Sequence, residues 1–203
     1  MLIDEAGAAR IAARIAEIER DTDAELVTVL ARRSDDYTYI PTLWAALVAF
    51  VVPWGLHWGP WWLDATELLL AQAITFVALF AVLRWPPLML RVIPGSVRTW
   101  RASSLARRQF LEQGLHHTAG ETGVLIFVSE AEHYVEILAD RGIDEHVGHE
   151  RWQAIVDAFT ARVKAGETVE GFIECVDACG ALLALHVPAT HERNELPNHL
   201  VMI

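Results

Sequence analysis

Two long apolar runs dominate the first half of the chain, at residues 40–63 and 68–83, with a short polar segment between them. From residue 37 to residue 83 the only charged side chains are Asp64 and Glu67. A helix of about 20 apolar residues crosses a hydrocarbon core about 30 Å thick. The pattern therefore predicts a two-helix transmembrane hairpin, with spans at about 40–60 and 65–85. Two prolines and two glycines place its turn, or a kink, at 53–60.

Tryptophan follows the same pattern. Six of the eight tryptophans lie at positions 44, 54, 58, 61, 62 and 85, near the expected ends of the two spans. Aromatic belts at both membrane–water interfaces have this distribution. The alternative is a buried helical pair inside a larger soluble fold, in which the other 156 residues would have to cover about 45 apolar ones. We therefore expect residues 40–85 to lie in the lipid bilayer.

The rest of the chain has the periodicities of a mixed α/β domain. Helical spacing of isoleucines predicts a helix at 4–21, and runs rich in apolar and β-branched residues predict strands at 25–31, 124–129 and 134–139. The last two strands form an antiparallel hairpin in the simplest arrangement. Further helices are expected at 98–117, 151–165 and 168–186, whereas the polar segment from 188 onward predicts disorder.

These elements predict an α/β fold with a small mixed β-sheet sandwiched by helices and interrupted by the inserted hairpin. The first part of the domain comprises residues 1–36, and the hairpin with its basic flanking segment comprises residues 37–94. The second part spans 95–187, and a disordered tail occupies 188–203. Such an insertion is tolerated when its two ends lie close together, as the ends of a hairpin do.

Charge and cysteine content exclude several classes of protein. The formal net charge of -11 argues against a nucleic-acid surface. Two cysteines, Cys175 and Cys179, exclude a disulfide-stapled scaffold and fit a buried core pair, although a metal or redox pair has the same spacing. The first twenty residues contain early acids and no long apolar segment, so we expect no secretory signal peptide.

Arginine sets the expected orientation. No acidic residue occurs between Glu67 and Glu112, and six arginines lie in that interval: Arg84, Arg91, Arg98, Arg101, Arg107 and Arg108. Because positive charge stays on the cytoplasmic side, both termini are expected there, in a multi-pass protein of a bacterial-type inner (plasma) membrane. The same arginines are expected to contact anionic lipid headgroups.

The densest group of polar side chains follows the strand at 134–139. It comprises Asp140, Asp144, Glu145, His146, His149 and Glu150. Carboxylates at a strand end suit Ca²⁺ or Mg²⁺. His146 and His149 share a helix face at i, i+3 spacing and could add a softer site. The first five of these residues are therefore the candidate metal ligands. The alternative is structural, because acidic residues before a helix complement its dipole. Arg141 could position a phosphate or pair with Asp140.

Residues 121–143, ETGVLIFVSEAEHYVEILADRGI, resemble the TPM-domain family. The segments 166–184, GETVEGFIECVDACGALLA, and 12–30, AARIAEIERDTDAELVTVL, are similar to its closing helix and to its opening helix and strand. The resemblance covers roughly 12–31 and 100–187. It implies a mixed α/β sandwich beside a membrane, and Asp140 matches the Asp of the family's Asp-Arg-Gly turn. Some members are associated with repair or assembly of membrane complexes, and others with phosphatase activity and divalent metals.

We expect this chain to depart from the family's usual plan, with no export signal and with its anchor inside the domain. Motifs of nucleophilic and nucleotide-binding sites are absent from the sequence, and no histidine is spaced to activate Ser129, which lies near Glu130 and Glu132. Two hypotheses follow. The protein is a non-enzymatic module that binds an unidentified membrane protein and assists assembly or turnover, or it is a divalent-metal-dependent phosphatase at the membrane surface.

Overall fold

The computed structural model describes residues 3–60, 62–118, 120–190 and 200–203. Its contacts divide the chain into two compact units. The first combines Met1–Ser34 with Thr99–Ile203, and the second is Asp35–Arg98. The first unit is therefore assembled from two segments that are far apart in the sequence.

A four-stranded mixed sheet forms the centre of the first unit, in the order β3-β2-β1-β4. Its strands are β1 (Glu25–Ala31), β2 (Gly123–Ser129), β3 (Tyr134–Ala139) and β4 (Leu200–Met202). β1 pairs in parallel with both β2 and β4, and β2 pairs antiparallel with β3. The predicted β2–β3 hairpin is thus confirmed. Every residue of β1 and β2 is buried, as expected for central strands made of nearly continuous apolar runs.

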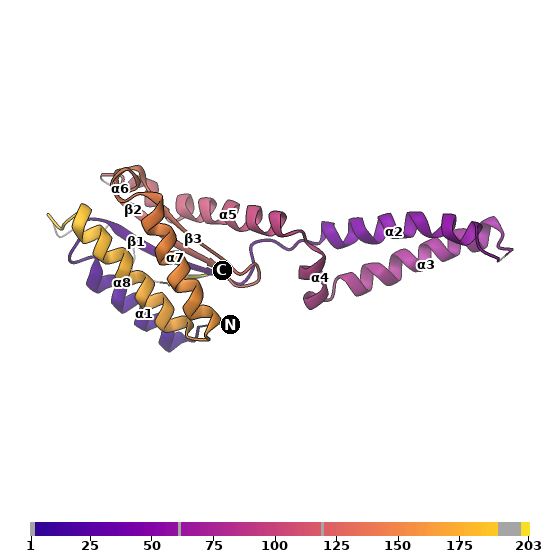
Figure 1. The fold of residues 1–203 in the computed structure, drawn as a ribbon, viewed down its shortest axis with the longest axis horizontal. Helices are drawn as coiled ribbons and strands as arrows, with labels where there is room; N and C mark the ends of the chain where they lie inside the picture. Colours follow the sequence, from indigo (N-terminus) through magenta and orange to yellow (C-terminus); the bar gives the residue numbers. More distant parts are fainter. Residues whose placement is uncertain (1–2, 61, 119, 191–199) are drawn as a thin grey trace. The chain divides into compact units, whose positions relative to one another are not determined.

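Helices cover both faces of the sheet, which confirms the predicted fold class (Figure 1). One face packs against α1 (Glu5–Ile18), α7 (His149–Lys164) and α8 (Thr168–His186). The other packs against α5 (Gly95–Glu112). Successive strand residues alternate between the two layers, as Leu26 and Leu30 enter the first and Val27 and Val29 the second.

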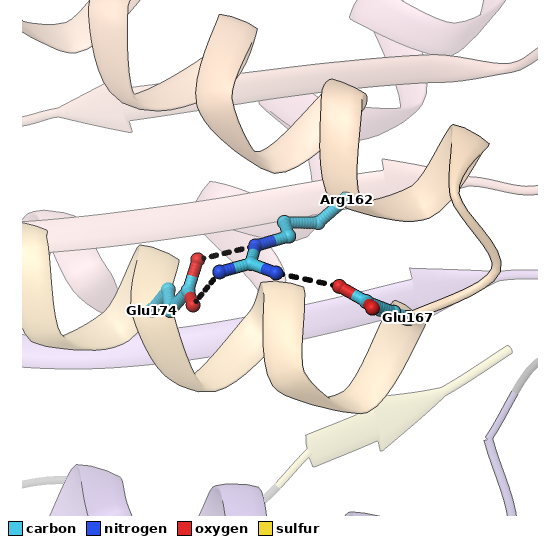
Figure 2. A network of polar contacts seen from close by, with 3 residues as sticks. All are labelled: Arg162, Glu167 and Glu174. Atoms are coloured by element: carbon cyan, nitrogen blue, oxygen red, sulfur yellow. Dashed lines mark hydrogen bonds and ion pairs between the residues drawn. The ribbon is translucent and has the colours of Figure 1, made fainter.

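Close packing and ion pairs hold α1, α7 and α8 together. A β-carbon at Gly180 of α8 would overlap the Ile18 side chain of α1 and would lie 2.9 Å from its Cδ1. At the α7–α8 turn, Arg162 makes ion pairs with Glu174 at 2.5 Å and Glu167 at 2.6 Å, as Figure 2 shows. The Glu174 contact is bidentate, and these hydrogen bonds raise the pKa of Arg162. Gly166, with φ of 85°, supplies the left-handed conformation that ends α7.

The structure corrects the sequence-based expectation at two places. The helix expected over 98–117 ends at Glu112, because the chain turns at Gly114, which is left-handed, and continues as the short 3₁₀ helix η1 (Leu115–His117). The tail expected to be disordered from 188 is ordered at both described ends. Pro188 forms a bridge with Thr22, and β4 adds to the open edge of β1, where Leu200 enters the core. Residues 191–199 lie outside the described residues.

The second unit consists of α2 (Tyr39–His57), α3 (Ala65–Leu83) and the short α4 (Pro86–Val92). α2 and α3 pack along each other as a hairpin (Figure 1). α2 continues through Pro53 to His57, so the turn comes after the first of the two expected prolines. A capping box starts α3, in which Glu67 N–H donates to Asp64 at 2.8 Å and Asp64 N–H donates to Glu67 at 2.9 Å. A small hydrophobic cluster joins the start of α2 to α4 and consists of Tyr37, Ile40, Met89 and Ile93.

Candidate functional site

α2 and α3 expose an extensive apolar surface within their own unit. Both are long and apolar enough to cross a membrane. Of the most apolar 18-residue segment in each helix, 22% is buried in α2 and 0% in α3. Side chains such as Phe50 and Ile74 are 64% and 67% exposed. The core helix of a soluble protein would instead be mostly buried, so these two helices are candidate membrane spans.

Polar and aromatic side chains gather at the ends of these helices. Trp54, Trp58 and Trp62 are exposed around the α2–α3 turn, while Trp61 lies outside the described residues. Trp85 is exposed just beyond the C-terminal end of α3, where Arg84 lies over the ring of Phe80 at 5.2 Å. The two acidic residues of the hairpin serve as the cap of α3. Aromatic and charged residues therefore flank the exposed apolar surface.

The basic stretch continues into α5, which has two different faces. Its buried residues, Ala102, Leu105, Ala106 and Gln109, face the sheet. Arg107, Arg108 and Trp100 are exposed on the rest of the helix, and Arg101 lies over the Trp100 ring at 4.8 Å. Of the six arginines singled out in the sequence, Arg84, Arg91, Arg107 and Arg108 are exposed, and the other two are half-buried.

The five candidate metal ligands do not converge. Asp140 is the N-cap of α6 (Arg141–Val147), and its carboxylate accepts the Arg141 N–H at 2.8 Å. Asp144, Glu145, His146 and His149 are exposed on α6 and at the start of α7. Throughout the described part of the chain, no group of three or more His, Cys, Asp or Glu side chains is placed to hold a metal ion. The structure thus gives the predicted Ca²⁺ or Mg²⁺ site no support.

Close backbone packing explains the Asp-Arg-Gly turn. Gly142 N–H donates to the Glu121 carbonyl at 3.0 Å, and Asp140 N–H donates to the Gly123 carbonyl at 2.8 Å. A β-carbon on Gly142 would overlap the Gly120 carbonyl oxygen and lie 2.7 Å from that of Glu121. Glycine is therefore required where α6 begins against the loop before β2. The residues that carry the family resemblance here have structural roles.

His146 has a neighbour that the sequence did not indicate. Its ring centroid lies 6.5 Å from that of His186, at the end of α8. The Arg151 guanidinium contacts His186 Nε2 at 3.2 Å. A fixed positive charge beside His186 opposes the binding of a cation to this histidine pair.

A buried polar cluster lies where the parallel strands β1 and β2 end. The Ser34 and Ser129 hydroxyls are 2.8 Å apart, and the Ser129 hydroxyl donates to the Glu132 carboxylate. The Ser34 N–H donates to both Glu132 oxygens, at 3.2 and 3.1 Å. Ser129 is 1% exposed, so a substrate cannot reach it. The cluster ties the loop after β1 to the β2–β3 turn. Sequence reasoning identified Ser129 and Glu132 but missed Ser34.

Two further groups have shifted pKa values outside the hairpin. Burial raises the pKa of Glu19 to about 7, with a smaller contribution from the nearby Glu25 charge, although the Leu26 N–H donates to Glu19 at 3.0 Å. The hydrogen bond with Cys175, and then burial, raise the pKa of the Cys179 thiol. Both cysteines are free and buried in α8, which fits their interpretation as core residues because neither presents an accessible thiolate.

One family model matches part of the chain, and one solved structure has a similar fold. Residues 95–182 match the sequence model of the TPM domain. The fold is similar to the NMR structure of BA42 protein from the psychrophilic bacterium Bizionia argentinensis, with a TM-score of 0.62 and 17% identity. That alignment covers 99% of this chain and 95% of the other, and at this identity the likeness concerns the fold alone. No curated protein matches the sequence.

Proposed function

Because residues 95–182 form a TPM domain, we propose that this protein is a membrane-anchored TPM module that binds membrane proteins. In this proposal α2 and α3 cross the bilayer twice, and the TPM domain lies on the cytoplasmic side. The module is non-enzymatic and assists the assembly or turnover of its partner. The exposed apolar surface of α2 and α3 is the observation that carries the proposal.

Length and end composition support spanning. Each helix has 19 residues, which at about 1.5 Å per residue gives about 28 Å, close to the hydrocarbon thickness of about 30 Å. The exposed tryptophans flank the two helices where interfacial aromatic belts would lie. A soluble unit would instead leave a large apolar surface in contact with water, which promotes aggregation.

Arginine placement supports the orientation. The six arginines follow α3, whereas the α2–α3 turn contains no Lys or Arg and carries Asp64 and Glu67. The positive-inside rule then puts both termini in the cytoplasm of a bacterial-type cell, at its inner membrane. Arg84, Arg91, Arg98, Arg101, Arg107 and Arg108 would contact anionic headgroups, at about 1 kcal/mol for each arginine near the surface.

The polar clusters favour a binding module over an enzyme. Asp140 caps a helix, and Ser129 with Glu132 joins two loops inside the domain. Each of these groups is engaged in holding the fold. The phosphatase alternative stays a prediction. It is tested by assaying purified protein with Ca²⁺, Mg²⁺ or Mn²⁺ beside Asp140→Ala and Asp144→Ala. Activity lost in both variants would defeat the non-enzymatic proposal.

Two experiments test the anchored module. After alkaline carbonate washing, the protein should remain in the membrane, and a reporter fused after Ile203 should read as cytoplasmic. Release into the wash, or a periplasmic reporter signal, would overturn the anchor or its orientation, respectively. A photo-crosslinker placed at exposed Ser104 on α5 should then capture a membrane protein in intact cells. The matched position Gln153, exposed on α7, should not capture the same protein.

A further inference from the structure

Gln72 is a polar side chain inside an otherwise apolar part of α3. It lies seven residues after Ala65 and eleven before Leu83, so in a spanning helix it is well inside the hydrocarbon region. Its carboxamide makes no hydrogen bond with any other residue that the structure describes. Thr42 in α2 differs, because its hydroxyl donates to the Thr38 carbonyl at 2.7 Å. Gln72 therefore has hydrogen-bonding groups that its own hairpin leaves unused.

The carboxamide lies at an open groove along the hairpin. Ala46 and Ala49 of α2 line one side of this groove, which has a volume of about 320 Å³, and Leu69, Gln72, Ala73 and Phe76 of α3 line the other. Three of these six residues are alanines, and small residues let the backbone of another helix approach closely. The groove therefore places a polar group beside small residues, against which the backbone of a further helix can pack closely.

In the membrane interior, the unused hydrogen-bonding groups of Gln72 would be energetically unfavourable. No water is present in the hydrocarbon core to satisfy an amide, so an unpaired carboxamide there is unfavourable. A carboxamide has both donors and an acceptor. Two copies related by a two-fold axis can therefore satisfy each other, because each Gln72 donates an N–H to the oxygen of its counterpart. Such an isologous contact uses the same surface on both copies.

We propose that this groove binds α3 of a second copy of the chain, with reciprocal Gln72 hydrogen bonds at the centre of the contact. The inference rests on the proposed spanning of α2 and α3. A lipid chain in the groove would leave the amide unpaired. A different helix would need its own polar group at the same depth, which a second copy has by symmetry.

Disulfide crosslinking in liposomes tests the contact with the full-length protein. Ala73→Cys should form a crosslinked dimer under mild oxidation, because Ala73 lines the groove beside Gln72 and this substitution leaves the Gln72 amide in place. Ile74→Cys is the matched control, since Ile74 is exposed on the same helix and does not line the groove. The native cysteines are buried in α8 and do not compete. Equal crosslinking at both positions, or none at either, would overturn the proposal.

A second measurement isolates the amide. Energy transfer between labelled copies at increasing lipid dilution gives the dimer dissociation constant in neutral phosphatidylcholine. Gln72→Leu should raise that constant about 3- to 20-fold for each hydrogen bond lost, whereas Gln72→Asn should retain part of the affinity. An unchanged constant in Gln72→Leu, while the protein resists carbonate extraction, would defeat this inference alone. Release by carbonate would defeat the proposed anchoring as well.

Discussion

Substitutions of Asp140 test whether its carboxylate is a structural helix cap, a metal ligand or a catalytic group. Its side chain accepts the Arg141 N–H at 2.8 Å as the cap of α6, on a partly exposed part of the surface. Loss of an N-cap costs about 0.5–2 kcal/mol, and Asn caps about as well as Asp. Because water can partly replace an exposed cap, we expect Asp140→Ala to lower the free energy of unfolding by about 0.5–1 kcal/mol. Asp140→Asn should leave it nearly unchanged.

Hydrogen exchange of the buried β1 and β2 amides measures this difference in the full-length protein, because these amides report the opening of the first unit. Asp144→Ala is the matched control, since Asp144 is an exposed carboxylate one turn further along α6 and does not cap it. Its effect should be limited to the helix-dipole contribution, at most about 1 kcal/mol at low salt and falling as salt is added.

A metal role for Asp140 gives a different result. An ion that binds only the folded state would stabilise the wild type as its concentration rises, and Asp140→Asn would reduce this gain by removing a charged ligand. The capping explanation is refuted if Asp140→Asn is as unstable as Asp140→Ala. It is also refuted if Ca²⁺ or Mg²⁺ protects the wild type but not the Asn variant.

Three further predictions concern stability. Gly180→Ala should lower the free energy of unfolding, because overlap with Ile18 costs about 1–3 kcal/mol. The gain in helix propensity offsets only about 1 kcal/mol of this cost. A higher free energy of unfolding in chemical denaturation would contradict this prediction. The pKa of Glu19 is raised to about 7 in the folded state, so its contribution is fully present below the unfolded pKa near 4.5 and is lost as pH rises towards 7. Glu19→Gln should flatten that part of the pH–stability curve, and an unaltered slope would exclude Glu19 as its source. Leu200→Ala should lower the free energy of unfolding by about 2–5 kcal/mol if β4 is an integral strand, because Leu200 is buried. A change near zero, measured by hydrogen exchange, would show that β4 is not integral.

The central strands could be predicted from sequence because their pattern is local. β1 and β3 have the predicted bounds, and β2 begins one residue earlier than expected, since apolar runs bounded by turns specify buried strands directly. The end of α5 and the pairing of β4 could not be predicted in the same way. β4 is three residues long, and its order depends on the open edge of β1, which is distant in the sequence.

The candidate sites were harder to predict from sequence than the strands, because their residues come from several elements. The residues from Asp140 to His149 are close in sequence, yet a helix cap and a helix start place them apart. Ser34 and Glu132 are 98 residues apart in the chain, yet they form one buried cluster. Local spacing indicates what one helix or turn can present, whereas a site assembled from several elements depends on the tertiary fold.

The pairing of β1 with β2 has a consequence for how the protein is made. Glu25 pairs with Gly123, and the whole α2–α3 hairpin is synthesised between them. The ribosome therefore releases α1 and β1 well before their partner strand exists, and the buried face of β1 stays uncovered during that interval. If the hairpin enters the membrane first, it shortens the effective loop that β1 and β2 must close. Membrane insertion would then be an early step in folding of the domain, and a chain with a delayed insertion step would be exposed to aggregation through β1.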